Sequence, residues 1–93
     1  MSDIQQILSK EKQHLMDKYP IKSLAIFGSY AKGLATKHSD VDLLVDFERP
    51  IGIQFIDLAD ELETLLSKKV DLVSKSGIKE KYFEAIKNDL MYV

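Results

Sequence analysis

The spacing of apolar positions along the chain predicts three main helices. Apolar residues recur at helical spacing from Ile4 to Lys18, and the Tyr19-Pro20 step should end this helix, because the residue before a proline is pushed out of the α region. From Gln54 to Ser67 they repeat every three or four positions, which predicts the most regular helix of the chain. The last helix is expected near the C-terminus, with an apolar face made of Ile78, Tyr82, Ile86 and Leu90.

Short apolar runs between these helices predict strands. Leu24–Phe27 is stopped by Gly28 and has the character of a buried strand. Val41–Phe47 is too continuous and too rich in β-forming residues for a surface helix, so it is expected to be a central strand. A third strand is expected at Val70–Val73. The alternation of helices and strands predicts one small α/β (α+β) domain, in which helices cover a mixed sheet of three or more strands.

Composition and charge narrow the classes of function. The chain has 93 residues, 45% of them apolar and 30% charged, which suits one small globular core. A net charge of −2 and the lack of a Lys/Arg block argue against a nucleic-acid partner. The absence of cysteine excludes disulfides, thiolate metal sites and cysteine nucleophiles. The sequence has no signal-peptide pattern and no apolar run near the roughly 18 residues of a membrane span, so we expect a soluble, cytoplasmic protein without a membrane partner.

Three aspartates stand at the starts of predicted strands. Asp40 and Asp42 lie two positions apart at the entrance of one strand, so strand alternation should place both side chains on the same face. Asp71 holds the comparable place in the next strand, and side-by-side pairing would bring its carboxylate to the other two. Three carboxylates on rigid strands can hold two divalent metal ions for phosphoryl displacement. An isolated Asp-x-Asp is more often a turn feature, so the metal hypothesis depends on the segment upstream.

The upstream segment has the features of a phosphate-binding turn. Gly28 and Ser29 lie where a predicted strand turns into a short helix, which should run to about Lys32 and end at Gly33. Glycine lets the backbone approach a ligand closely, and free amides at a helix N-terminus attract phosphate oxygens. The Ser29 hydroxyl can contact phosphates or can only cap the helix, and Lys32 on the same helix face can add a positive charge. Alone, this turn is a weak signal.

In combination, the two motifs form a recognisable pattern. Gly28-Ser29 is followed after ten residues by Asp40-Val41-Asp42, and Val70-Asp71-Leu72-Val73 comes later. In this pattern, together with the flanking helices, nearly the whole chain resembles the minimal nucleotidyltransferases of the DNA polymerase beta-like superfamily.

The resemblance implies a nucleotidyltransferase domain over residues 1–93 that uses ATP and Mg²⁺, with two ions expected. It implies that Gly28 and Ser29 hold the nucleotide phosphates and that Asp40 and Asp42 bind magnesium. It also implies that Asp71 completes the metal site and accepts the proton of the acceptor hydroxyl. Family members commonly have arginine where Lys32 stands, and lysine keeps the charge but loses the bidentate fork.

The acceptor is expected to belong to another chain, because 93 residues supply little beyond a sheet and its helices. Minimal members of the resembled family are often encoded beside a small helical HEPN protein and act as antitoxins, some by adding AMP to a tyrosine of the toxin. The resemblance therefore implies transfer of AMP from ATP to a hydroxyl of a HEPN-type partner. The alternative is a non-catalytic binding module that neutralises its partner by contact.

Several other side chains receive simpler interpretations. Tyr30 can stack on a nucleotide base or pack under the loop, His38 is expected to be solvated, and Asp46 is expected to pair with a lysine or reach solvent. A solvated helix face is expected for Asp57, Asp60, Glu61 and Glu63. An apolar C-terminal end predicts a homodimer or a stable hetero-complex; its residues are Tyr82, Phe83, Leu90, Met91, Tyr92 and Val93.

Overall fold

Four strands form one mixed sheet in the computed structural model, which describes residues 3–93. The spatial order is β3-β2-β1-β4, so β2 lies inside the sheet, as its continuous apolar sequence predicts. β2 runs antiparallel to β1 and parallel to β3, and the short β4 is antiparallel to β1. The strands are β1 (Ile21–Phe27), β2 (Val41–Phe47), β3 (Val70–Ser74) and β4 (Met91–Tyr92).

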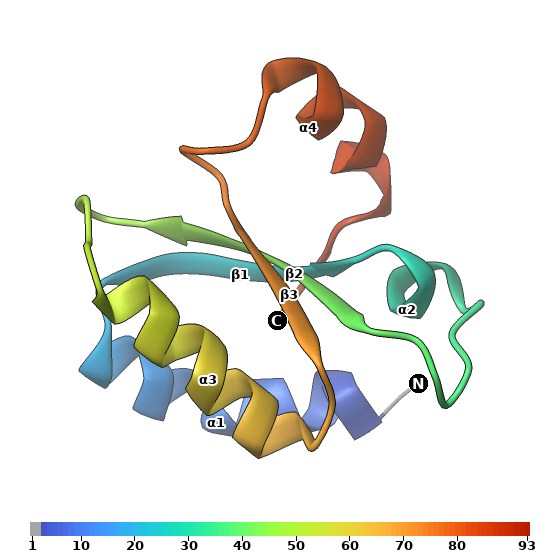
Figure 1. The fold of residues 1–93 in the computed structure, drawn as a ribbon, viewed down its shortest axis with the longest axis horizontal. Coiled ribbons are helices and arrows are strands. Elements are labelled where there is room, and N and C mark those ends of the chain that lie inside the picture. Colours follow the sequence, from blue (N-terminus) through green and yellow to red (C-terminus); the bar gives the residue numbers. More distant parts are fainter. Residues whose placement is uncertain (1–2) are drawn as a thin grey trace.

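The helices cover the two faces of this sheet unequally. Figure 1 shows the two long helices, α1 and α3, on one face, and the shorter α4 on the opposite side. The helix α2 follows β1 directly at one end of the sheet (Figure 1). Within residues 3–93, no helix has the length and apolar character needed to cross a bilayer. The bounds are α1 (Asp3–Lys18), α2 (Ser29–Lys32), α3 (Gln54–Leu66) and α4 (Glu80–Ile86).

Side-chain alternation along β2 separates the core from a second, more polar face. Val41, Leu43 and Val45 are buried in the core with apolar residues of α1 and α3. Asp42 and Asp46 therefore point to the other face, which we call the acid face. A slip of the β2 register by one residue would bury these carboxylates in the core, so the apolar pattern fixes which face carries the acids.

The N-terminal half of β1 differs from its predicted bounds. The strand begins at Ile21, three residues before the predicted start, and its pairing with β2 shifts between Ile21 and Ser23. Such a β-bulge changes which side of the strand faces the core. Apolar alternation is interrupted at that point, which explains why the sequence pattern indicated only the later part of the strand.

The C-terminal segment departs further from the predicted helix. α4 ends at Ile86 and is followed by a 3₁₀ turn, η1 (Lys87–Asp89), and by β4, so Ile78 and Leu90 lie outside the helix. β4 pairs with β1, and the Val93 amide donates to the Leu24 carbonyl at 3.0 Å. Met91 and Val93 pack against the core as a result, and the expected apolar patch is smaller than predicted. Of its six residues, only Tyr82 and Tyr92 are exposed large side chains.

Glu61 joins α1 to α3 and is not simply a solvated surface charge. Its carboxylate accepts a hydrogen bond from the buried Tyr19 hydroxyl at 2.9 Å and pairs with Lys18 at 3.0 Å and with His14 at 3.3 Å. The hydrogen bond from Lys18 is the main factor that lowers the Glu61 pKa. Burial and the hydrogen bond to Glu61 raise the pKa of Tyr19 to about 12. Glu63 also has a structural role, because it accepts from the Val70 amide at 2.9 Å.

Replacing Glu61 with Gln should lower the free energy of unfolding at neutral pH by about 1–2 kcal/mol, because the charged acceptor of Tyr19 and Lys18 is lost. The folded-state pKa of Glu61 is depressed, so its contribution is present above the ordinary value of 4.5 and is lost as the pH falls through the folded pKa. Urea unfolding of wild type and Glu61→Gln from neutral to acidic pH measures both effects. Glu48→Gln, at an exposed position, is the control. Equal stability of the two proteins at pH 7 would contradict the role of Glu61.

Candidate functional site

The register of β2 against β3 brings two of the predicted acids together. Asp42 and Asp71 are direct partners in this parallel pair, and both belong to the acid face. Asp40 lies one residue before β2, so a turn, and not strand alternation, presents it. Asp40 and Asp71 are exposed and Asp42 is half-buried. The structure thus brings the strand-borne acids together as the sequence predicts, with Asp40 beside them.

The turn that carries Asp40 is held by its own hydrogen bonds. The Ser39 hydroxyl accepts from the Thr36 amide at 2.9 Å, and the Thr36 hydroxyl accepts from the His38 amide at 3.2 Å. The Val41 amide donates to the Lys69 carbonyl at 2.9 Å, which ties the entrance of β2 to the entrance of β3. His38 is exposed, in agreement with its interpretation as a solvated residue.

The three carboxylates interact electrostatically. The pKa of Asp42 is raised above its ordinary value of 3.8, first by burial, then by the negative charge of Asp71 and then by that of Asp40. All three causes disfavour the ionised form, and both charges belong to the predicted metal ligands. The site therefore concentrates negative charge around one half-buried carboxylate.

The chemistry of this donor set fits a divalent cation. Carboxylate oxygens are the ligands that Mg²⁺ prefers, and a cation would offset the repulsion that raises the Asp42 pKa. Within residues 3–93, no three acidic, histidine or cysteine side chains are already gathered closely enough to form a complete metal cage. The acids of this site share a neighbourhood without converging on one point.

Gly28 lies directly against the Asp42 carboxylate. Its φ of 73° and ψ of −149° belong to a region that only glycine adopts readily. A Cβ at this position would overlap Oδ2 of Asp42 and would lie 3.0 Å from its Cγ. Glycine is thus required by backbone conformation and by the close approach of the acid. Phe27, the residue before it, is the β1 partner of Asp42.

The prediction that Ser29 caps α2 is wrong. Gly28 occupies the N-cap position, and no side-chain hydrogen bond caps the helix. The helix starts one residue before the predicted position, because the Gly28 carbonyl accepts a hydrogen bond from the Lys32 amide at 3.1 Å. Ser29 is therefore the first helical residue and half-buried beside the acid site. The predicted end of the helix is confirmed, since Gly33 adopts the left-handed conformation with a φ of 74°.

Two side chains of α2 have partners that the sequence did not indicate. The Lys32 ammonium (Nζ) lies 3.8 Å from Oδ2 of Asp89 in η1, and both side chains are about half exposed. Tyr30 packs against the core, with the Lys68 ammonium 6.0 Å from the centre of its ring. Of the two interpretations of Tyr30, the structure thus favours packing over contact with a base.

Tyr82 is the residue near the acids whose position the sequence analysis missed. Its ring meets that of Phe27 edge-on, at a centroid distance of 6.4 Å and an interplanar angle of 81°. Phe27 is buried, whereas the Tyr82 side chain is 49% exposed. No local pattern could reveal this contact, because it depends on how the C-terminal segment folds back over β1.

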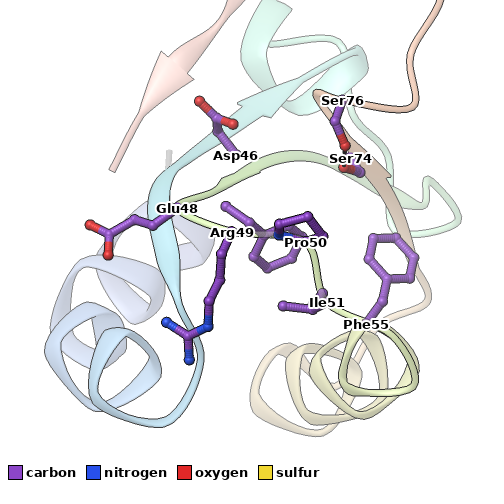
Figure 2. Close-up of a pocket in the computed structure, with 9 residues that line it drawn as sticks. Asp46, Glu48, Arg49, Pro50, Ile51, Phe55, Ser74 and Ser76 are labelled. Carbon is purple, nitrogen blue, oxygen red and sulfur yellow. Dashed lines mark hydrogen bonds between the residues drawn. The ribbon is translucent and has the colours of Figure 1, made fainter.

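A separate cavity of about 370 Å³ lies at the opposite end of β2 from Asp42. Figure 2 shows its lining, with Ser74 and Ser76 on one side and Phe55 of α3 on another. Asp46 lines this cavity and, within the described chain, forms no ion pair with a lysine. Its acidic lining residues are Asp46 and Glu48, with Arg49 next in the chain, and neither a third acid nor a glycine turn joins them in the lining. The chemistry of metal-dependent transfer therefore points to the open acid site instead.

Comparisons with known proteins show the family of the chain. The chain matches the family described as the nucleotidyltransferase domain over residues 8–92. One relative, from Methanocaldococcus jannaschii, is named as a protein adenylyltransferase and is 50% identical to this chain. The alignment covers 100% of this chain and 97% of the relative. Protein adenylyltransferase MntA of Thermococcus cleftensis is 39% identical, with 100% and 95% of the two chains covered.

Solved structures show the same fold. A structure described as a minimal nucleotidyltransferase superposes with a TM-score of 0.79 at 29% identity, covering 97% of this chain and 95% of that one. A second match belongs to a complex of tri-AMPylated Shewanella oneidensis HEPN toxin with MNT antitoxin. Its TM-score is 0.73 at 23% identity, with 96% and 70% of the chains covered, and at this identity the likeness is one of fold.

Replacing Asp42 with Asn should stabilise the metal-free protein at neutral pH. The folded-state pKa of Asp42 is raised, so the stability linked to its proton is present below the ordinary value of 3.8 and is lost as the pH rises through the folded pKa. Asparagine is uncharged at every pH and so mimics the protonated form of Asp42. The melting temperature of Asp42→Asn in a chelator should exceed that of wild type at pH 7, and the difference should shrink on acidification.

Asp46→Asn is the matched control, because it removes a carboxylate from the same face of β2 opposite Ser23. A lower melting temperature for Asp42→Asn than for wild type at pH 7 would show that the carboxylate supports the fold, contrary to this account.

Proposed function

The chain belongs to the nucleotidyltransferase domain family, and we propose that it transfers AMP from Mg-ATP to a tyrosine hydroxyl of a HEPN-type partner protein and so acts as an antitoxin. The observation that carries the proposal is the pairing of Asp42 with Asp71 beside Gly28. This arrangement places a cluster of carboxylates next to a backbone turn that a side chain cannot fill. Nucleotidyl transfer needs both features, one for metal and one for phosphate.

Each residue of the motif receives a role in this proposal. The turn at Gly28 and Ser29 holds the phosphates of ATP. Asp40, Asp42 and Asp71 would hold Mg²⁺, and we expect two ions. The bound metal would supply charge neutralisation at the phosphates and at the leaving pyrophosphate. Asp42 is the half-buried member of the three, and Asp40 and Asp71 are exposed beside it.

Lys32 is proposed to leave its ion pair with Asp89 and contact the phosphates of ATP. Its ion pair with Asp89 is long, at 3.8 Å, and about half exposed on both sides. Such pairs contribute roughly 0–1 kcal/mol, so the larger negative charge of a triphosphate can draw the ammonium away. As a point charge, Lys32 would assist phosphate binding without the bidentate geometry of an arginine.

In the transfer step, Asp71 is proposed to accept the proton of the tyrosine hydroxyl. The tyrosine oxygen attacks the α-phosphorus of ATP, the bond from that phosphorus to the bridging oxygen breaks, and pyrophosphate leaves. The hydroxyl proton passes to a carboxylate, and Asp71 suits this role because it comes from the edge strand β3 and is exposed toward an incoming acceptor.

A protein acceptor is supported by two kinds of observation. The names of the similar proteins from M. jannaschii and T. cleftensis are those of protein adenylyltransferases, and the S. oneidensis complex pairs an MNT antitoxin with an AMPylated HEPN toxin. The exposure of Asp40 and Asp71 also leaves the site open at the surface, which suits an acceptor carried by another macromolecule.

Asp71→Asn should reduce AMP transfer to the partner by roughly 10²–10⁴-fold, the usual effect of losing a positioned base, while the partner complex still forms. Intact mass of the partner after incubation with Mg-ATP measures transfer, and gel filtration measures the complex. Asp60→Asn, on an exposed face of α3 across the sheet, should behave as wild type. If Asp71→Asn and wild type neutralise the partner equally, with no AMP on it in either case, the chain acts by contact and the catalytic proposal is wrong.

A further inference from the structure

The four tyrosines of the chain divide between the two faces of the sheet. Tyr19 is buried between α1 and α3, where its hydroxyl is bound to Glu61, and Tyr30 packs against the same core. Tyr82 and Tyr92 are exposed, at 49% and 56% of their full residue surface. Tyr92 is the β4 partner of Ala25, which places it on the acid face, and Tyr82 reaches that face through its contact with Phe27.

Tyr82 is separated from the acid site by a single side chain. Phe27 is the cross-strand partner of Asp42, and the side chains of such partners are direct neighbours on one face of a sheet. Phe27 is also the residue before Gly28. The Tyr82 ring, 6.4 Å from that of Phe27, therefore lies next to a residue that adjoins both the carboxylates and the phosphate turn.

The Tyr82 ring contacts Phe27 on one side and is open on the other. Its edge meets the buried Phe27 ring, and the Lys75 ammonium lies 5.4 Å from the centre of the ring of Phe83, on the same helix as Tyr82. About half of Tyr82 remains accessible. An accessible aromatic ring beside the proposed triphosphate site is suited to stacking on a nucleobase.

We propose that Tyr82 is the platform on which the adenine base of ATP stacks. The inference rests on the proposed use of ATP at the acid site and adds the residue that recognises the base. Tyr92 is a poorer candidate, because β4 lies on the far side of β1 from β2 and its partner Ala25 is two residues before Phe27. Tyr30, the residue that the sequence suggested for this role, is held against the core.

The test separates recognition of the base from recognition of the phosphates. ATP and inorganic tripolyphosphate, each with Mg²⁺, are titrated into wild type, Tyr82→Leu, Tyr82→Phe and Tyr92→Leu by calorimetry. Leucine keeps an apolar contact with Phe27 but removes the aromatic face, so Tyr82→Leu should weaken ATP binding by about five-fold or more and leave tripolyphosphate binding within about two-fold. Tyr82→Phe and Tyr92→Leu should bind both ligands as wild type does.

Two results would overturn the proposal. Unchanged ATP affinity in Tyr82→Leu would show that the ring does not contact the base, while ATP binding by wild type would leave the proposed function standing. Equal weakening of ATP and tripolyphosphate would show that Tyr82 acts only by supporting Phe27 and the phosphate turn. Failure of wild type to bind either ligand would remove the proposed function as well. If Tyr82→Leu does not fold, Tyr82→Gln takes its place, because glutamine also removes the aromatic face. A loss of ATP affinity in Tyr82→Gln with tripolyphosphate binding kept supports the proposal, and either unchanged ATP affinity or a parallel loss of both opposes it.

Discussion

The close approach of Gly28 to the Asp42 carboxylate is the constraint on which the rest of the site depends. A side chain at Gly28 would push that carboxylate aside, and a backbone with a φ of 73° is strained for any residue with a Cβ. The same backbone turn ends β1, starts α2 and leaves Ser29 inside the helix. One glycine thereby sets the position of the turn at Gly28 and Ser29 relative to the acids. The antiparallel pairing of Phe27 with Asp42 fixes that relation within the sheet.

The acid face and the core face of the sheet have opposite effects on stability. Val41, Leu43 and Val45 bury apolar surface against α1 and α3, and Glu61 adds a charged link between those helices. The alternate positions carry Asp42, whose charge is disfavoured by burial and by its neighbours. The fold tolerates this repulsion because the core-facing residues of the same strand stabilise its position in the sheet. A site whose charges oppose folding in the absence of a ligand is typical of selection for binding or chemistry over stability.

Local sequence patterns predicted the elements that build the site, and contacts between distant segments account for the rest. The pairing of Asp42 with Asp71 could be anticipated because each begins an apolar strand of matching character. The bulge after Ile21 and the two-residue β4 leave no regular alternation to detect. The contacts of Tyr82 with Phe27 and of Lys32 with Asp89 depend on the path of the C-terminal segment, which periodicity does not describe. These contacts revise the interpretation of Lys32 and Tyr82, and packing against the core revises that of Tyr30, without moving the acids.

The central claim is that the carboxylates and the glycine turn act together as a Mg-ATP site. The most direct test is the metal dependence of ATP binding, measured by calorimetry with Mg²⁺ and with a chelator, for wild type and Asp42→Asn. The account predicts that wild type binds ATP much more tightly with Mg²⁺ and that Asp42→Asn loses most of this gain, because its carboxylate is the half-buried centre of the donor set. Equal affinity of the two proteins for ATP in the presence of Mg²⁺ would contradict it.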